Sequence, residues 1–236
     1  MENIDPKDRL IFALDTATVR EAEEFVARLD GVVSFFKVGI ILHTLTGAGF
    51  VSSLAKRGKK VFLDLKYFDI GDTVRDAVKQ AAGLGVDFLT VHADRQVMNA
   101  AVEGKGGSGM KILAVTLLTS VSASDLKEAG INLSPEEVVV RRAKIACECG
   151  CDGVIASGRE ASIIKKETGG KLLVVTPGVR PAGASVDGQK RIATPADAIR
   201  AGADYLVVGR PVKNAPDPRA TAMAILEEMG MAFPNP

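Results

Sequence analysis

The sequence contains no tryptophan, only two tyrosines and two histidines, and almost no excess of charge of either sign. Among its 236 residues, 30 Lys and Arg residues stand against 29 Asp and Glu residues, which gives a net charge of +1. A balanced chain without a block of basic residues gives no support for a nucleic-acid-binding or membrane-surface protein. We therefore expect a small-molecule partner, with no nucleic acid and no membrane involved.

Long apolar runs are also absent. No run reaches the 18 or so apolar residues that a membrane-spanning helix needs, and the amino-terminal segment MENIDPKDRL lacks the apolar centre of a secretory signal. These features predict a cytoplasmic protein. The only three cysteines fall together in CECGCDG, without a CxxC pair or a nearby histidine, and this favours small buried residues at a helix end over a metal or redox site.

Short apolar runs, by contrast, recur along the whole chain. Eight of them read as buried strands, with helical segments between them: residues 9–15, 33–39, 60–66, 87–93, 111–118, 152–157, 171–178 and 204–209. Alternating strands and helices are typical of a parallel sheet, and eight such units in 236 residues match the size of a (β/α)8 barrel. The predicted fold is an α/β protein, with residues 1–236 forming one TIM-barrel catalytic domain.

Short motifs mark where the helices start and stop. A Gly-x-Asp motif precedes an apolar run three times, at residues 85–87, 150–152 and 202–204, and each glycine suits a helix end. Ser134, Pro135 and Glu137 have the spacing of a helix N-cap with a capping box, and Thr194 with Pro195 repeats its first two elements. The connections between strands are therefore predicted to be helices.

Polar residues gather where the apolar runs stop. They are Asp15, Lys37, Asp64, Lys66, His92, Thr119, Ser120, Thr176, Gly209 and Arg210. The active site of a TIM barrel lies at the carboxyl ends of its strands, so these residues are the candidates for a single site.

The densest group of charges lies in VFLDLKYFDIGDTV. Asp64 and Lys66 are two residues apart on a strand, so their side chains share a face, the barrel interior if Leu63 and Leu65 face the helices. Lys37 ends a neighbouring run and can join them in a network that is close to neutral. A purely structural salt-bridge cluster is the alternative; the location at the active end of the barrel favours function.

Two further carboxylates, Asp69 and Asp72, follow Lys66 in the sequence. Asp69 or Asp72 could cap the helix that is expected to start near Thr73, and we favour this role for Asp72. No metal site is expected at the strand ends, because cationic Lys37 stands where a second carboxylate would be needed to hold a divalent ion.

The sequence also predicts a phosphate-binding site. In TIM barrels it commonly forms from the loops after the seventh and eighth strands, which here read TPGVRPAGASVDGQKR and VVGRPV. Glycine backbone N–H groups and the forked donors of Arg180 and Arg210 suit a phosphate, and Gly209 lies beside Arg210. A solvated loop is a serious alternative for Lys190 and Arg191.

These motifs resemble those of the orotidine 5'-monophosphate decarboxylase family, in its bacterial branch, over nearly the whole chain. The family pattern Asp-x-Lys-x-x-Asp-Ile followed by Thr stands here as Asp64, Lys66, Asp69, Ile70 and Thr73. The segments ALD, FKVG, TLLTS, TPGVRP and VVGRPV match as well. Gly71 replaces a proline often found after the isoleucine, a change that removes no charged group.

The resemblance implies cofactor-independent decarboxylation of orotidine 5'-monophosphate to uridine 5'-monophosphate and CO2, the final step of de novo UMP biosynthesis. Lys66 would be the proton donor to C6, and Asp64, Lys37 and Asp69 would complete the catalytic group. It also implies a homodimer with shared sites, in which Asp69 and Thr73 reach into the partner's site. The implied substrate-binding residues are Asp15, Lys37, Thr73, Thr119, Ser120, Pro177, Arg180, Gln189, Gly209 and Arg210.

Three other functions remain open. A magnesium-dependent sugar-phosphate decarboxylase or aldol-type synthase shares the Asp-x-Lys-x-x-Asp core, although Lys37 argues against it. A non-catalytic phosphate-ligand binding barrel would keep the same pocket. A Schiff-base aldolase is disfavoured, because carboxylates beside Lys66 keep that lysine protonated and poorly nucleophilic.

Overall fold

The computed structural model describes residues 6–180 and 193–232. Eight parallel strands form a closed barrel in the order of the sequence, each hydrogen-bonded to the next and the last to the first. They are β1 (Leu10–Ala13), β2 (Phe35–Gly39), β3 (Lys60–Tyr67), β4 (Phe88–His92), β5 (Lys111–Val115), β6 (Gly153–Ile155), β7 (Leu173–Pro177) and β8 (Tyr205–Val208). Each predicted run coincides with one strand, and the ends differ by at most three residues.

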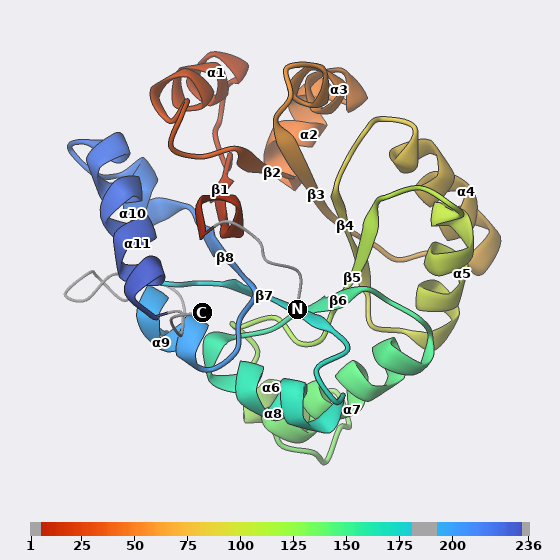
Figure 1. The fold of residues 1–236 in the computed structure, drawn as a ribbon. Helices are drawn as coiled ribbons and strands as arrows, with labels where there is room; N and C mark the ends of the chain where they lie inside the picture. The colour runs from red at the N-terminus through yellow and green to blue at the C-terminus, as the bar shows by residue number, and fades with distance from the viewer. Residues whose placement is uncertain (1–5, 181–192, 233–236) are drawn as a thin grey trace.

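The helices surround this barrel (Figure 1). The principal ones are α1 (Val19–Arg28), α2 (Ile40–Thr46), α3 (Ala48–Lys56), α4 (Gly71–Ala82), α5 (Arg95–Lys105), α7 (Pro135–Glu148), α8 (Ala161–Glu167), α9 (Pro195–Arg200) and α11 (Pro218–Ala232). The others are η1 (Pro6–Arg9), α6 (Ala123–Glu128), η2 (Gly158–Glu160) and α10 (Arg210–Lys213). The predicted TIM-barrel fold is confirmed, whereas the assignment of the whole span 1–236 to one domain stays a prediction. No helix within the described ranges is both long and apolar enough to cross a membrane.

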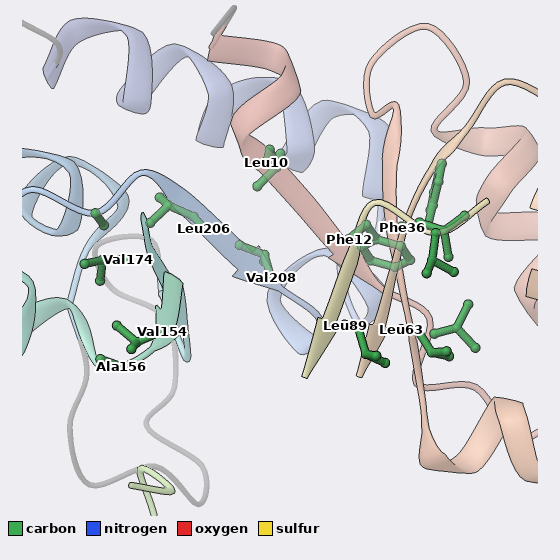
Figure 2. Packing of buried hydrophobic residues seen from close by; sticks show 14 of the residues in the cluster. Leu10, Phe12, Phe36, Leu63, Leu89, Val154, Ala156, Val174, Leu206 and Val208 are labelled. Carbon is green, nitrogen blue, oxygen red and sulfur yellow. The ribbon is translucent and has the colours of Figure 1, made fainter. Parts of the chain in front are cut away.

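Side chains that alternate along the strands build two apolar layers. Those facing outward belong to one apolar cluster with side chains of the helices. Figure 2 shows Phe12, Phe36, Leu63, Leu89, Val174 and Leu206 of this cluster. Those facing inward fill the barrel with Ile11, Phe35, Phe62, Phe88, Leu113, Val175, Tyr205 and Val207. Within this inner layer, the ring of Phe88 lies 4.9 Å from that of Phe35 and 5.0 Å from that of Tyr205, both edge-on. The barrel is therefore closed by an aromatic plug, and a polar site can lie only at its ends.

The predicted helix signals behave as their chemistry requires. The Ser134 hydroxyl accepts from the Glu137 N–H, and the Glu137 carboxylate accepts from the Ser134 N–H, which completes the capping box of α7. The Thr194 hydroxyl caps α9 by accepting a hydrogen bond from the Asp197 N–H. The glycines of the three Gly-x-Asp motifs all have a positive φ, between 76° and 101°, which favours glycine after a helix.

The aspartates of these motifs lock neighbouring strands together at the amino-terminal end of the barrel. Asp87, Asp152 and Asp204 each precede a strand and accept a hydrogen bond of 2.7–2.8 Å from a backbone N–H on the strand before it. Lys105 pairs with Asp152 and Lys165 with Asp204, both at 2.6 Å. Polar residues at the strand starts thus hold the register of the sheet, a role that the sequence motif alone did not indicate.

Candidate active site

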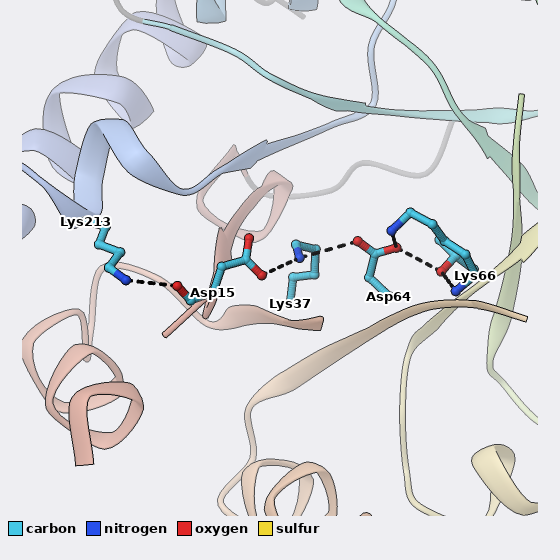
Figure 3. Close-up of polar contacts among 6 residues, drawn as sticks. Asp15, Lys37, Asp64, Lys66 and Lys213 are labelled. Carbon is cyan, nitrogen blue, oxygen red and sulfur yellow. Dashed lines mark hydrogen bonds and ion pairs between the residues drawn. The ribbon is translucent and has the colours of Figure 1, made fainter. Parts of the chain in front are cut away.

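A chain of alternating charges crosses the carboxyl ends of the first three strands (Figure 3). The Lys37 ammonium lies 3.0 Å from an Asp15 carboxylate oxygen and 3.4 Å from an Asp64 carboxylate oxygen. The Lys66 ammonium lies 2.8 Å from the other oxygen of Asp64. Side-chain exposure is 11% for Lys37, 14% for Asp64 and 27% for Lys66. These three groups are thus largely withdrawn from water, whereas the Asp15 side chain is 48% exposed, and the four charges balance one another in pairs.

The strands place these groups by simple alternation. Phe62 belongs to the inner plug and Leu63 to the outer layer, so Asp64 faces inward, two residues after Phe62. Gly39, at the end of β2, makes room for the array, because a Cβ atom there would lie 2.9 Å from both the Lys37 ammonium and an Asp15 oxygen. The glycine of the FKVG segment therefore has a steric reason.

The backbone at Lys66 is irregular. Its φ is +51°, and among the described residues no other non-glycine has a positive φ. The register between β3 and β4 shifts at the same place, between Leu63 and Tyr67. Thr90 of β4 bonds to this segment, because its hydroxyl donates to Asp64 at 2.9 Å and accepts from the Lys66 N–H at 3.0 Å. Neither the strain nor the contacts of Thr90 were predicted, since both depend on the register of a neighbouring strand.

The neighbours of Asp64 decide its charge state. Burial raises the pKa of the Asp64 carboxyl, but the Lys37 and Lys66 ammonium groups and the Thr90 hydroxyl outweigh burial and hold that pKa below its ordinary value. Asp64 is therefore a carboxylate at neutral pH and keeps the Lys66 ammonium in place.

Two cavities that share lining residues open beside the charge chain. The larger, about 420 Å³, is lined by Asp15, Lys37, Gly39, Asp64, Lys66, Gly178, Arg180, Gly209 and Arg210, among others. The smaller, about 180 Å³, is mostly apolar and is lined by Phe62, Val115, Leu117, Thr119, Ile155, Ala156 and Val207, among others. Both include Lys37, Asp64, Lys66 and Pro177. The site can hold a ligand with an apolar ring at one end and an anionic group at the other, with the Lys66 ammonium at the junction.

The arginines of the predicted phosphate site line the larger cavity and not the smaller one. Arg180 is buried and its guanidinium donates to the carbonyl oxygen of Val179 at 2.9 Å, whereas Arg210 is exposed at the start of α10. Gln189 lies outside the described residues. A larger surface groove of about 550 Å³ runs along α7 beside Arg95 and Ile163. It is not lined by any residue of the charge chain, that is, by Asp15, Lys37, Asp64 or Lys66.

Three of the predicted site residues that the structure describes line neither cavity. Asp69 and Thr73 are exposed and line neither cavity, and Ser120 is exposed beside Thr119. An Asp69 carboxylate oxygen accepts from the N–H of Ile70 at 2.7 Å. Within one chain, the motif therefore delivers Asp64 and Lys66 to the site and leaves its second aspartate on the surface.

The prediction that Asp72 caps a helix starting near Thr73 is wrong. Helix α4 begins at Gly71, its N-cap is Ile70, and that cap makes no side-chain hydrogen bond. Asp72 lies in the first turn and pairs with Arg75 at 2.8 Å. It favours the helix through its charge near the amino terminus.

His92 and the cysteines lie outside the charge chain. Burial, Arg142 and Lys66 lower the pKa of His92, whose ring lies edge-on to Phe68 at 5.2 Å. The three cysteines are free thiols at the end of α7 and just after it, as predicted, but only Cys151 is buried, and Cys147 and Cys149 are partly exposed. No cluster of three or more His, Cys, Asp or Glu side chains suited to a metal ion occurs in the described part of the chain.

Comparison with known proteins decides the family. Residues 8–225 match the model of the "Orotidine 5'-phosphate decarboxylase / HUMPS family". The chain belongs to this family.

Relatives within the orotidine 5'-phosphate decarboxylase family are similar over nearly the full length. A protein from Nitrobacter winogradskyi named orotidine 5'-phosphate decarboxylase is 51% identical over 227 residues, which cover 96% of this chain and 95% of that protein. One of the same name from Bradyrhizobium diazoefficiens is 52% identical over 230 residues, 98% and 97% of the two chains. The crystal structure of orotidine 5'-phosphate decarboxylase from Lactobacillus acidophilus superposes with a TM-score of 0.83 at 37% identity, over 94% and 99%. The predicted family and enzyme class are confirmed.

Proposed function

We propose that this chain converts orotidine 5'-monophosphate to uridine 5'-monophosphate and CO2 in pyrimidine biosynthesis, with Lys66 as the proton donor and without a metal or organic cofactor. The observation that carries the proposal is the position of the Lys66 ammonium, paired with Asp64 at 2.8 Å where an apolar and a cationic cavity meet. The names of the relatives supply the substrate. The cytoplasmic location stays a prediction.

The two cavities suggest how the substrate is held. We place the pyrimidine ring in the apolar cavity beside Thr119 and Pro177. Ser120, which is exposed next to Thr119, is proposed to contact the edge of the ring. The ribose hydroxyls then face Asp15 and Lys37. The phosphate reaches the cationic end of the larger cavity, where we assign it to Arg180, Gln189, Gly209 and Arg210. Only Gln189 of this set lies outside the described residues.

The chemical step requires a carbanion at C6. The bond from C6 to the carboxylate breaks, its electron pair stays on C6, CO2 leaves, and a proton moves from the Lys66 Nζ to C6. Solvent then restores the proton on Lys66. An ammonium about 4 Å from the developing charge contributes on the order of 4 kcal/mol at an effective dielectric of 20. This alone is too small for an enzyme, so binding energy from the phosphate end and exclusion of water must add to it.

Asp64 has two effects on this step. Its carboxylate holds the Lys66 ammonium in position through the 2.8 Å ion pair, and repulsion between this carboxylate and that of the substrate can destabilise the bound ground state. We assign the first effect the larger weight, because ground-state stress is contested as a source of catalysis.

We further propose a homodimer in which Asp69 and Thr73 complete the site of the partner subunit. Phe68 and Ile70, on either side of Asp69, are 66% and 69% exposed. Large apolar side chains exposed next to one another commonly mark an interface. Covering them with a second copy would bring the adjacent carboxylate of Asp69 toward another barrel mouth.

Mixing two inactive variants tests the shared site. A heterodimer of Lys66→Ala and Asp69→Asn chains has one site with both defects and one site with none. Random exchange of subunits should therefore restore about a quarter of the wild-type activity. No recovery after exchange that is verified by native mass spectrometry would contradict the shared site.

The substrate and the metal requirement are tested together. Purified protein in EDTA should consume orotidine 5'-monophosphate, followed by its ultraviolet absorbance, and in D2O the product should carry deuterium at C6. Activity that appears only with added magnesium would favour the metal-dependent synthase or decarboxylase. Binding of uridine 5'-monophosphate without turnover would favour a binding protein, and trapping of Lys66 by borohydride would favour a Schiff-base enzyme.

A further inference from the structure

A bulge in β3 surrounds the proposed proton donor. In the pairing of β3 with β4, Leu63 lies opposite Leu89 and Tyr67 lies opposite Val91. The segment from Asp64 to Lys66 therefore faces the single residue Thr90. Bulges of this kind often re-aim side chains next to active sites.

Thr90 of β4 lies opposite this bulge. Its side chain is completely buried, with 0% of the residue exposed, and it lines neither of the two cavities. Its hydroxyl oxygen accepts the Lys66 N–H at 3.0 Å, and its proton is donated to Asp64 at 2.9 Å. One hydroxyl has one proton and two lone pairs, so both bonds are satisfied at the same time.

The bond to Lys66 counteracts an unfavourable backbone conformation. Lys66 has φ +51°, a region that L-residues other than glycine, asparagine and aspartate rarely adopt. Such a conformation persists only where the surroundings determine it, and it then tends to be part of a functional site. The Thr90 hydroxyl is a buried contact that fixes the backbone of Lys66 and the carboxylate to which the Lys66 ammonium is paired.

We propose that Thr90 is a positioning residue for the decarboxylation: its hydroxyl holds the Lys66 backbone in the left-handed conformation and orients Asp64, so that the Lys66 ammonium points into the junction of the two cavities. This inference rests on the proposed function. Because Thr90 lines neither cavity, its loss should slow the chemical step and leave substrate binding nearly unchanged.

Three variants separate this role from packing. Thr90→Val keeps the shape and removes the hydroxyl, Thr90→Ser keeps the hydroxyl, and Thr116→Val is the matched control. Thr116 is also 0% exposed, and its hydroxyl donates to the carbonyl oxygen of Ile155 at 2.8 Å, away from the charge chain. We expect Thr90→Val to lower kcat by about tenfold to a hundredfold with KM changed by less than about threefold, while Thr90→Ser and Thr116→Val stay within about threefold of wild type.

A second measurement follows the proton transfer alone. Exchange of the C6 proton of bound uridine 5'-monophosphate with D2O, read by proton NMR, requires Lys66 to remove that proton. Thr90→Val should slow this exchange about as much as it slows turnover, and Thr116→Val should leave it unchanged. Thermal unfolding of each variant verifies that the protein is folded. If Thr90→Val does not fold, Thr90→Cys, with its weak donor, takes its place.

The outcomes distinguish the inference from the function on which it rests. A wild-type protein that does not decarboxylate the substrate refutes the proposed function. An active wild type together with a folded Thr90→Val that keeps kcat and C6 exchange within about twofold refutes the role of Thr90. Equal losses in Thr90→Val and Thr116→Val also refute it, since they indicate a general packing effect.

Discussion

Replacing Lys66 by alanine tests the proposed role of the charge chain most directly. The change removes an ammonium about 4 Å from the developing carbanion, which at an effective dielectric of 20 is about 4 kcal/mol, or about a thousandfold in rate. It also removes the proton donor, and general acid catalysis contributes about another hundredfold to ten-thousandfold. We therefore expect kcat to fall by about five to seven orders of magnitude.

The fold should tolerate this substitution. Asp64 keeps its contact with Lys37 at 3.4 Å and its hydrogen bond from Thr90 at 2.9 Å, so no buried carboxylate is left unpaired. The Lys66 side chain is 27% exposed, which limits what the pair contributes to stability. We expect the free energy of unfolding to change by less than about 2 kcal/mol.

The matched control is Lys165→Ala. Lys165 pairs with Asp204 at 2.6 Å and its side chain is 21% exposed, but it lies at the amino-terminal end of the barrel. This variant should lose stability and keep its turnover. Both proteins are assayed by substrate absorbance after expression in a host that lacks its own decarboxylase, and their unfolding is measured in urea. A folded Lys66→Ala protein with more than a tenth of the wild-type kcat would refute the assignment of Lys66.

Three further predictions concern stability and reactivity. Gly153→Ala should lower the free energy of unfolding by about 1–3 kcal/mol, because its Cβ would lie 2.6 Å from the Leu173 carbonyl oxygen, whereas Gly49→Ala meets open space; equal melting temperatures of the two variants would contradict this. Burial raises the pKa of the Cys151 thiol to about 12, so a thiol reagent at pH 8 should label Cys151 only after unfolding. If the folded Cys151→Ala protein has one fast-reacting thiol fewer than the folded wild type, the prediction is contradicted. Burial and nearby cations lower the pKa of His92, so the unfolded chain binds more protons than the folded one, and the free energy of unfolding should fall as the pH drops from about 6.5 through the folded pKa. In His92→Asn, the free energy of unfolding, measured in urea at several pH values, should fall less steeply over this range. The same dependence on pH as in the wild type would count against the role of His92.

The sequence was sufficient wherever one element determined the outcome. Buried strands are visible as apolar runs, and the two-residue period of a strand places Asp64 and Lys66 on one face. The capping box at Ser134 is equally local, since it needs only residues three positions apart.

The remaining features depend on contacts between segments far apart in the sequence. The left-handed conformation of Lys66 and its bond to Thr90 arise from the register between β3 and β4, which no local pattern records. Asp72 has the chemistry of a cap, but the backbone enters α4 two residues earlier than expected, at Gly71. Asp69 lies exposed on the surface of the single chain, so its place in a shared site stays a proposal.

The aspartates that precede β4, β6 and β8 also determine how the heat stability of this protein can be raised. Asp87, Asp152 and Asp204 hold the sheet at the end of the barrel opposite the charge array. Heat tolerance and catalysis can therefore be selected on separate residues, and the usual trade-off between the two is weakened. A mutant library confined to the strand-start end can be screened for resistance to heat alone, and its best members should retain turnover without further selection.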